Sequence, residues 1–388
     1  MKNHWFHRLV WAIITPPLWL FTRIRFNFHP HPKPLPEPYL AVSNHCNDLD
    51  PIFLGLTLRK QCYYIASEHI FRKGNGLGGR ILMALQAPIV RQKGTTAGDT
   101  ALTAIRRLRK GCSVAVFAEG NRSFNGQTGS IVASTAKLAK ASGATLVTHR
   151  FRGGYLTAPR WASHLRRGRL DSEIVGIYPP DVLKTMTAAE VADLLRRDIY
   201  ENAFVTQRER MIPYRSKKPA EHIERALYFC PRCGKGGGLQ SRDDELFCTC
   251  GMRTRLNVYS FFEGGDLPFD NMLDWDRWQA EQMLQLVQNA GEEPIASDED
   301  VVLEEISDDR TVRRLGVGTL TAYRDRFELC GEVIPFASVS GIGLSSSQGI
   351  ELTCGGHHWF ITSLRICNLR KYSTFYRAAI TPEDILAV

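Results

Sequence analysis

Short apolar runs alternate with stretches of helical periodicity through the first 204 residues of the chain. The apolar runs have the length of strands, and we predict strands at 39–44, 61–67, 87–91, 113–119, 144–151 and 173–179. The stretches between them predict helices at 50–58, 99–111, 129–143 and 187–204. Gly111 and Gly143 follow two of these helices, and Thr187 and Glu190 stand at capping-box spacing at the start of another. This alternation predicts an α/β layer structure with ligand chemistry at the strand ends.

The pattern changes in the last third of the chain. A helix followed by an acidic linker is predicted at 259–310. Several short strands separated by turn residues follow in 311–388, and a helix is predicted at 364–380. Strands closed by a terminal helix resemble the pleckstrin-homology fold, so we expect a small β-rich C-terminal domain. His357 and His358 fall in one of its strands and are predicted to be structural.

The N-terminal segment holds an apolar run of 13 residues from Leu9 to Phe21. The run is shorter than the roughly 20 residues that span a bilayer, and Pro16 and Pro17 interrupt it. Its flanks and interior carry the aromatic and basic residues Trp5, Trp11, Trp19, Arg8, Arg23 and Arg25. A signal peptide is disfavoured because no small-residue cleavage site follows. We expect residues 1–35 to form interfacial helices at a membrane surface, the alternative being a helix packed on the protein's own core.

The first motif with chemical potential is NHCNDLD, which follows the first predicted strand. The next helix is predicted to open with Asp50 as its N-cap and Pro51 in its first turn. His45 would then lie in the connecting loop. If the Asp50 carboxylate accepts the proton of one imidazole nitrogen, the other nitrogen becomes a general base that can deprotonate a hydroxyl. In the alternative, Asp50 only caps its helix and His45 is only a polar loop residue.

A second block, SVAVFAEGNRS, is an apolar strand that ends in Glu119, Gly120 and Arg122. Gly120 permits a tight turn, and the forked guanidinium of Arg122 suits a phosphate. The alternative is a salt bridge within the loop between Glu119 and Arg122. Between the two blocks, the strand in QAPIVRQKG ends in Arg91 and brings a second cation to a strand terminus.

In this order the three blocks resemble the glycerolipid acyltransferase family that includes 1-acylglycerol-3-phosphate acyltransferase. That family has a His-x4-Asp motif, a strand ending in arginine and an FPEGTRS-like motif. The matching residues are His45 and Asp50, then Arg91, then Phe117, Glu119, Gly120, Arg122 and Ser123. The departures are Ala118 in place of proline and Asn121 in place of threonine, and neither removes a group that the chemistry requires. The family's fourth block, around a proline, is matched only by Thr148 near that position, and no residue is carried over from it. The resemblance covers roughly residues 1–210.

The resemblance implies an acyltransferase domain at 36–215 that moves a fatty acyl group from an acyl thioester to a lysophosphatidate-like acceptor in phospholipid synthesis. It implies that His45 is the base and Asp50 its orienting carboxylate. Arg91 and Arg122 would hold the acceptor phosphate, with Glu119 and Gly120 shaping its pocket. Catalysis would need no cofactor, and acyl-CoA or acyl carrier protein would supply the acyl group. Glycerol 3-phosphate and other lysophospholipids remain open as acceptors.

Charge divides the chain of 388 residues, a length typical of two or three domains. Residues 1–250 carry 37 Lys and Arg against 19 Asp and Glu, whereas residues 251–388 carry 12 against 21. A basic half of this size suits a phospholipid membrane surface, phosphate esters or nucleic acid. The densest basic cluster, 160–169, is either a headgroup contact or a solvated face. We expect a peripheral or monotopic protein on the cytoplasmic face of the cell membrane. A non-catalytic nucleic-acid-binding protein would leave His45 and Asp50 unexplained.

Four of the ten cysteines form two close pairs: Cys230 with Cys233, and Cys248 with Cys250, with 14 residues between the pairs. Two such pairs followed by glycine predict a zinc-ribbon-like segment at 225–258 that holds one structural zinc ion. The second pair has one intervening residue instead of two, which departs from the usual spacing. Two disulfides are the alternative, disfavoured in a reducing cytosol. Of the remaining cysteines, Cys46 adjoins His45, so a role as nucleophile is an alternative. It is disfavoured because the acyltransferase mechanism needs no covalent intermediate.

Overall fold

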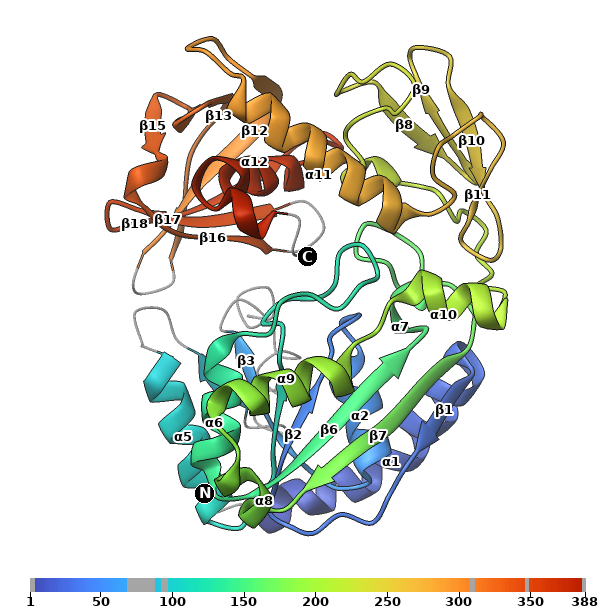
Figure 1. The fold of residues 1–388 in the computed structure, drawn as a ribbon, viewed down its shortest axis with the longest axis vertical. Coiled ribbons are helices and arrows are strands. Elements are labelled where there is room, and N and C mark those ends of the chain that lie inside the picture. The colour runs from blue at the N-terminus through green and yellow to red at the C-terminus, as the bar shows by residue number, and fades with distance from the viewer. Residues whose placement is uncertain (1–3, 68–87, 92–96, 308–310, 346–348, 386–388) are drawn as a thin grey trace. The chain divides into compact units, whose positions relative to one another are not determined.

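The computed structural model describes residues 4–67, 88–91, 97–307, 311–345 and 349–385. The chain divides into two compact units, which we describe separately (Figure 1). We call them the sheet-helix unit, residues Met1–Pro159 with Arg166–Arg215, and the C-terminal unit, residues Arg160–Leu165 with Ser216–Val388.

The sheet-helix unit is built on one seven-stranded mixed sheet (Figure 1). In spatial order its strands are β1 (Phe28–His31), β7 (Leu170–Tyr178), β6 (Thr145–Arg152), β2 (Tyr39–Ser43), β5 (Val114–Phe117), β3 (Tyr63–Ser67) and β4 (Ile89–Arg91). The five strands from β6 to β4 run parallel, so their carboxyl ends share one edge, while β7 is antiparallel to β6. All six predicted strands are present, which confirms the α/β prediction. The additional edge strand β1 pairs with β7 and places residues 28–31 in the sheet, although the sequence had placed them in the membrane-associating segment 1–35.

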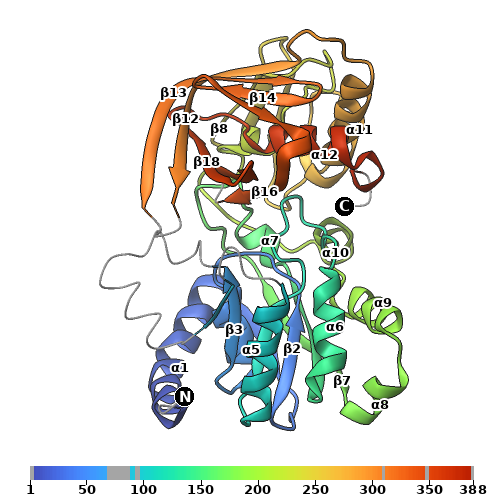
Figure 2. The same ribbon diagram turned by 90° about the vertical axis from the view of Figure 1, so that its left-hand side faces the viewer.

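Helices cover both faces of this sheet, as the view in Figure 2 helps to follow. One group consists of α5 (Ala97–Arg109), α6 (Ala133–Ser142), α8 (Pro180–Thr185) and α9 (Ala188–Ile199). This group encloses an apolar cluster that includes Leu40, Leu146 and Leu195. The capping box predicted at Thr187 and Glu190 is present at the start of α9. The other group consists of α1 (His4–Phe26) and α2 (Asp50–Leu58), and the short helices α7 (Gly154–Thr157) and α10 (Ala203–Arg210) complete the unit.

The N-terminal helix α1 is continuous through Pro16 and Pro17, so the expectation that these prolines break it is wrong. Each proline lacks the backbone N–H that would donate to the carbonyl oxygen four residues earlier, at Ala12 and Ile13. Both of these residues lie on the exposed side of the helix. None of the helices in the described part of the chain is both long enough and apolar enough to cross a membrane.

A close approach between α1 and α2 depends on Gly55. A Cβ atom at Gly55 would lie 2.6 Å from the indole of Trp11, so a larger residue would push α1 outward. Thr22 and Phe26 are buried on the same helix, and the Phe26 ring contacts the Phe53 ring of α2 at 5.3 Å between centroids. One face of α1 therefore packs on the protein's own core, as the alternative interpretation required, while other apolar residues of the helix remain exposed.

The C-terminal unit begins with the 3-10 helix η1 (Ile223–Arg225) and a four-stranded antiparallel sheet. Its strands in spatial order are β11 (Phe262–Glu263), β10 (Arg253–Leu256), β9 (Glu245–Cys248) and β8 (Leu239–Arg242). Helix α11 (Met272–Gln288) follows, as predicted.

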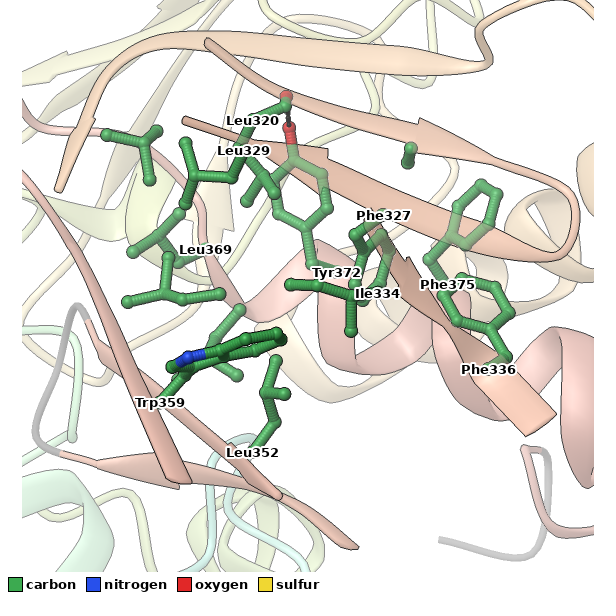
Figure 3. Close-up of a cluster of buried hydrophobic side chains, with 14 of the residues drawn as sticks. Leu320, Phe327, Leu329, Ile334, Phe336, Leu352, Trp359, Leu369, Tyr372 and Phe375 are labelled. Atoms are coloured by element: carbon green, nitrogen blue, oxygen red, sulfur yellow. Dashed lines mark hydrogen bonds between the residues drawn. The ribbon is translucent and has the colours of Figure 1, made fainter. Parts of the chain in front are cut away.

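A second seven-stranded sheet, antiparallel throughout, forms the rest of this unit. Its spatial order is β15 (Glu332–Pro335), β14 (Arg326–Leu329), β13 (Val312–Tyr323), β12 (Ala296–Ile306), β18 (His357–Ser363), β17 (Gly349–Cys354) and β16 (Val339–Ser345). Helix α12 (Arg370–Ile380) packs on it, and Figure 3 shows Tyr372 and Phe375 of this helix among the buried side chains of the sheet. The Tyr372 hydroxyl donates to the carbonyl oxygen of Leu320 at 3.0 Å. A pleckstrin-homology-like fold for this part stays a prediction.

The acidic linker predicted up to residue 310 is wrong, because residues 296–306 form β12 at the centre of that sheet. Val301 and Leu303 are buried in the core. Neighbouring partners accommodate the acidic residues: Asp298 accepts a hydrogen bond from the Tyr372 hydroxyl at 2.7 Å, and Glu305 pairs with Arg313 at 2.7 Å. The acidic residues of this segment indicated a solvated linker. It forms a strand because residues of neighbouring strands and of α12 pair with its carboxylates.

Candidate active site

His45 and Asp50 lie together at the carboxyl end of β2. The His45 Nδ1 donates to Asp50 Oδ2 at 2.8 Å, and the Asp50 side chain is 0% exposed against 19% for His45. The same oxygen accepts the backbone N–H groups of Cys46 at 2.5 Å and Asn47 at 2.9 Å. The predicted N-cap role of Asp50 is wrong: Leu49 occupies the cap position, and Asp50 begins the helix with its carboxylate turned back into the loop.

This arrangement determines which imidazole nitrogen is available. Since Asp50 accepts from Nδ1, that nitrogen carries the proton and Nε2 has a free lone pair. Within the described residues, Nε2 of His45 has no hydrogen-bond partner. The imidazole also stacks on the ring of Phe117, with centroids 4.2 Å apart and planes 16° apart. The ring is therefore held on one edge and one face, and its free nitrogen can accept a proton.

Glu119 connects the two motif loops. Its Oε1 accepts the backbone N–H of His45 at 2.6 Å, and its Oε2 accepts the backbone N–H of Gly129 at 2.7 Å. A further backbone bond joins the loops, from Ser123 N–H to the His45 carbonyl oxygen at 2.8 Å. Burial raises the pKa of Glu119 to about 8, against the two backbone donors, which lower it. Glu119 thus holds the backbone of the histidine loop in position through these hydrogen bonds.

Gly120 and Arg122 occupy the turn after β5. Gly120 has φ +68°, a left-handed conformation that favours glycine, and its site is exposed. Arg122 Nη1 pairs with Asp48 Oδ2 at 2.9 Å, so the alternative of a Glu119–Arg122 salt bridge is not what forms. Asp48 is a residue that the motif analysis missed, and its carboxylate is largely exposed, so an incoming anion could replace it.

Arg91 is the last residue of β4, opposite Ser67 of β3 in the parallel register. Its backbone therefore lies at the same sheet edge as the ends of β2 and β5. Its side chain lies outside the described part of the structure.

A small cavity of about 10 Å³ adjoins the histidine loop, with Cys46, Glu119, Tyr155 and Glu201 among its lining residues. This volume is about that of one water. Burial raises the pKa of Glu201 to about 7. The sequence analysis placed this residue inside a helix predicted to run to residue 204, but α9 ends at Ile199 and Glu201 lies between α9 and α10. Burial, and then the Asp50 and Glu119 carboxylates, raise the pKa of the Cys46 thiol well above its usual value. This environment opposes a thiolate nucleophile at Cys46.

The fourth motif region lies in the core of β6. Thr148 Oγ1 donates to Asp198 Oδ2 at 2.7 Å, and both residues are buried. His149 is also fully buried and bridges the hydroxyls of Ser43 and Ser172, at 2.8 and 2.7 Å. Burial lowers its pKa to about 3, so it is neutral. These contacts are structural.

The basic cluster 160–169 is not one uniform surface. Arg160 and Arg166 are buried, and Arg160 donates to the Leu344 carbonyl oxygen at 2.8 Å within the C-terminal unit. Burial lowers the pKa of Arg166 to about 10. The count of basic residues therefore overstated the charge available to an anionic surface.

The four paired cysteines converge at one end of the C-terminal unit. One thiol atom from each of Cys230, Cys233, Cys248 and Cys250 lies within 4.8 Å of the others. The donor set of four thiols is compatible with a structural zinc ion. His357 and His358 lie away from this group, on β18, where His357 pairs with Glu305 at 2.7 Å and His358 contacts the hydroxyl of Thr353 at 2.9 Å.

Comparison with known proteins identifies the class of this site. The acyltransferase family model matches residues 25–152. Among solved structures, the crystal structure of the 1-acyl-sn-glycerophosphate (LPA) acyltransferase PlsC from Thermotoga maritima is similar, with a TM-score of 0.40 and 18% sequence identity over 48% of this chain and 78% of that chain. A comparison with the curated proteins finds no match.

The matched range runs from the end of α1 to the end of β6 and contains His45, Asp50 and Glu119. Residues 25–152 therefore match the acyltransferase family model, which confirms the family resemblance seen in the sequence. Residues 216–388 lie outside the match.

Proposed function

We propose that this protein transfers a fatty acyl group from an acyl thioester to the free hydroxyl of a lysophosphatidate-like acceptor. The observation that carries the proposal is the 2.8 Å hydrogen bond from His45 Nδ1 to the fully buried Asp50 carboxylate. The bond leaves Nε2 as a base on a partly exposed ring, at the edge of the sheet where parallel strands deliver side chains to ligands.

Proton flow follows from this geometry. His45 Nε2 accepts the proton of the acceptor hydroxyl as the oxygen attacks the thioester carbonyl carbon. The Asp50 carboxylate stabilises the imidazolium that forms, at a contact already made in the free protein. The tetrahedral intermediate then breaks its carbon–sulfur bond, and the proton on Nε2 passes to the departing thiolate. The products are an ester and a free thiol, and neither a metal nor a redox cofactor is required.

Arg122 is the described cation that best suits the acceptor phosphate. In the structure it pairs with Asp48, whose side chain is largely exposed. A phosphate carries more charge than one carboxylate and matches the guanidinium fork, so it can displace Asp48. Arg91, at the end of β4, would supply a second cation from the same edge of the sheet.

The exposed face of α1 supports binding to a phospholipid surface. Its exposed apolar side chains include Trp5, Leu9, Ile13, Leu20 and Ile24. At 3.6 residues per turn these five positions fall within an arc of about 100°, and the exposed rings of Trp19 and Phe21 lie on either side of it. A groove of about 560 Å³ beside this helix is lined by Trp11, Trp19 and Leu56 and by the cations Arg8, Arg59 and Lys60. Apolar rings beside cations suit the boundary between acyl chains and headgroups. We propose that the protein is a peripheral or monotopic protein on the cytoplasmic face of the cell membrane.

The test is an assay of the purified protein with a panel of lysophospholipids and glycerol 3-phosphate, each with acyl-CoA and with acyl carrier protein as donor. Transfer to lysophosphatidate above the other acceptors supports the proposal, and transfer to another acceptor reassigns the headgroup. A protein that transfers to none of them and binds duplex DNA with a steep salt dependence would instead be the nucleic-acid-binding alternative.

A further inference from the structure

The spacing of the four cysteine thiols fits a single tetrahedral metal ion. The Sγ atoms of Cys230 and Cys250 lie 3.7 Å apart, and those of Cys233 and Cys248 lie 4.0 Å apart. Four sulfurs at the Zn–S distance of about 2.3 Å from one ion are about 3.8 Å from each other. Disulfide-bonded sulfurs would be about 2.05 Å apart. The Cys230–Cys250 and Cys233–Cys248 sulfur–sulfur distances are therefore those of two ligands on one ion, and not those of disulfides.

The backbone around the thiols forms two turns, each closed by the N–H of the glycine that follows the cysteine pair. Gly234 follows the first pair with φ +69° and donates to the Cys230 carbonyl oxygen at 2.8 Å. Gly251 follows the second pair with φ +92° and donates to the Cys248 carbonyl oxygen at 2.9 Å. The shorter spacing of the second pair therefore still produces a turn that brings both thiols to one point.

The first turn is anchored to α11 by buried hydrogen bonds. The indole Nε1 of Trp275 donates to the Phe229 carbonyl oxygen at 2.9 Å, one residue before Cys230. The backbone N–H of Tyr228 donates to Gln279 Oε1 at 2.9 Å, and Gln279 Nε2 donates to the Ala226 carbonyl oxygen at 2.9 Å. Trp275 and Gln279 are fully buried, so losing these bonds would leave polar groups unsatisfied in the core.

The same segment is anchored to α12. Arg370 Nη2 pairs with Asp276 Oδ2 of α11 at 2.7 Å, and Arg370 Nη1 donates to the Ala226 carbonyl oxygen at 3.3 Å. Asn368 Nδ2 donates to the Glu224 carbonyl oxygen at 3.0 Å. Helix α12 in turn packs its Tyr372 on the large antiparallel sheet. A continuous set of contacts thus runs from the thiols through residues 224–230 to both helices of the C-terminal unit.

We propose that Cys230, Cys233, Cys248 and Cys250 bind one Zn²⁺ ion, and that this ion holds residues 224–230 in the conformation on which α11 docks. The ion is then a structural element of the whole C-terminal unit and not of the four-stranded sheet alone. Four protein ligands fill a tetrahedral site, so no position remains for substrate or a reactive water. The proposal is independent of the acyl-transfer chemistry, because none of these residues belongs to the motif loops.

The experiment uses the full-length protein and measures metal content together with hydrogen exchange. We expect about one zinc per chain in the wild type and in Cys354→Ser, a control that replaces a buried cysteine of β17 outside the cluster. We expect no zinc in the double variant Cys230→Ser, Cys233→Ser. Chelation of the wild type should increase exchange in residues 224–230 and across α11, and addition of Zn²⁺ should restore protection. Exchange in β2 and β6 should not change.

Chelation of the wild type keeps the test decisive even if the double variant does not fold. If α11 remains fully protected from hydrogen exchange in the metal-free protein, the ion does not hold residues 224–230 in the conformation on which α11 docks. Purified protein containing iron in place of zinc, or a mass that shows two disulfides and no metal, would overturn the assignment of the ion.

Discussion

The backbone N–H of His45 donates to the Glu119 carboxylate at 2.6 Å, although the two residues are 74 positions apart in the chain. The contact exists because β2 and β5 are parallel neighbours and Ser43 stands opposite Phe117 in their register. His45 and Glu119 therefore follow the carboxyl ends of two neighbouring strands, at the same edge of the sheet. Five predictions concern this site, the stability of its unit and its expected membrane surface.

Replacing Glu119 with Gln should reduce kcat more than KM. The amide nitrogen cannot accept a hydrogen bond, so one of the two backbone donors, of His45 or Gly129, loses its partner. The His45 loop should then be less well positioned, with little direct effect on substrate binding. Steady-state kinetics with acceptor and donor varied separately measure this. A change confined to KM for the acceptor would show that Glu119 acts on the substrate instead.

The same variant has a pH signature. The pKa of Glu119 is raised from its usual 4.5 to about 8, so the folded state holds a proton that the unfolded state has released between these values. This contribution to stability is complete below about pH 4.5 and is lost as pH rises through about 8. Glu119 alone should make the free energy of unfolding fall by up to roughly 1.4 kcal/mol per pH unit in this window. Glu119→Gln should remove the part of this pH dependence that lies above pH 7. Glu201, with its pKa raised to about 7, should still contribute a slope of the same sign below that pH. Denaturant unfolding at several pH values tests this, and an unchanged slope above pH 7 would contradict it.

His45→Ala should abolish acyl transfer while the protein remains folded. A positioned general base contributes roughly 100-fold or more to rate, and Nε2 of His45 is the proposed base. Asp50→Asn should also lose most activity, because the amide can present its N–H to Nδ1 and favour the wrong tautomer. His31→Ala replaces a half-exposed histidine of the same unit and should keep full activity. Activity assays paired with thermal melting check these variants, and a fully active His45→Ala would refute the mechanism.

Arg122→Ala should raise KM for a phosphate-bearing acceptor roughly 10-fold and leave KM for the acyl donor nearly unchanged, because one charge-assisted contact to the phosphate is lost. Asp48→Ala should act in the opposite direction, since it removes the carboxylate that competes with phosphate for Arg122. Arg91→Ala should resemble Arg122→Ala.

The matched control for these variants is Arg109→Ala, an exposed arginine at the end of α5. It should change neither KM value. A larger effect of Arg122→Ala on the donor than on the acceptor would assign Arg122 to the phosphates of the donor. An Asp48→Ala variant with weaker acceptor binding would show that Asp48 supports the site and does not compete for it.

Ile13→Asp should weaken association with anionic phospholipid vesicles, because it places a charge in the middle of the exposed apolar face of α1. Leu102→Asp is the control, since Leu102 is an apolar residue of α5 that is exposed to a similar extent. Vesicle flotation measures binding, and transfer to a short-chain, water-soluble acceptor should be retained in both variants. Equal flotation of Ile13→Asp and wild type would exclude this face as the membrane contact.

Much of the sheet-helix unit could be predicted from the sequence because its information is local. Several of its signals act within a few residues: the strand and helix periodicities, the glycines at 111 and 143 after α5 and α6, and the Thr187–Glu190 capping box. The motif residues at the ends of β2 and β5 were visible for the same reason, since a strand followed by polar residues is a local pattern.

Local patterns failed where a partner distant in sequence decides the outcome. The acidic residues of β12 indicated a linker, yet the strand forms because β13 and β18 pair with it and because Arg313 and Tyr372 satisfy its carboxylates. The edge strand β1 exists only because β7 offers a pairing partner.

The sequence alone determined which chemical groups this protein has: a histidine and an aspartate in one loop, a glutamate and an arginine in another, and four cysteines in two pairs. Tertiary structure decided how they are matched. Glu119 binds the backbone of His45 and not Arg122, while Arg122 pairs with Asp48. The reason is physical: a side chain pairs with whatever the fold brings within about 3 Å of it, and that depends on the order of strands in the sheet, which no local pattern encodes.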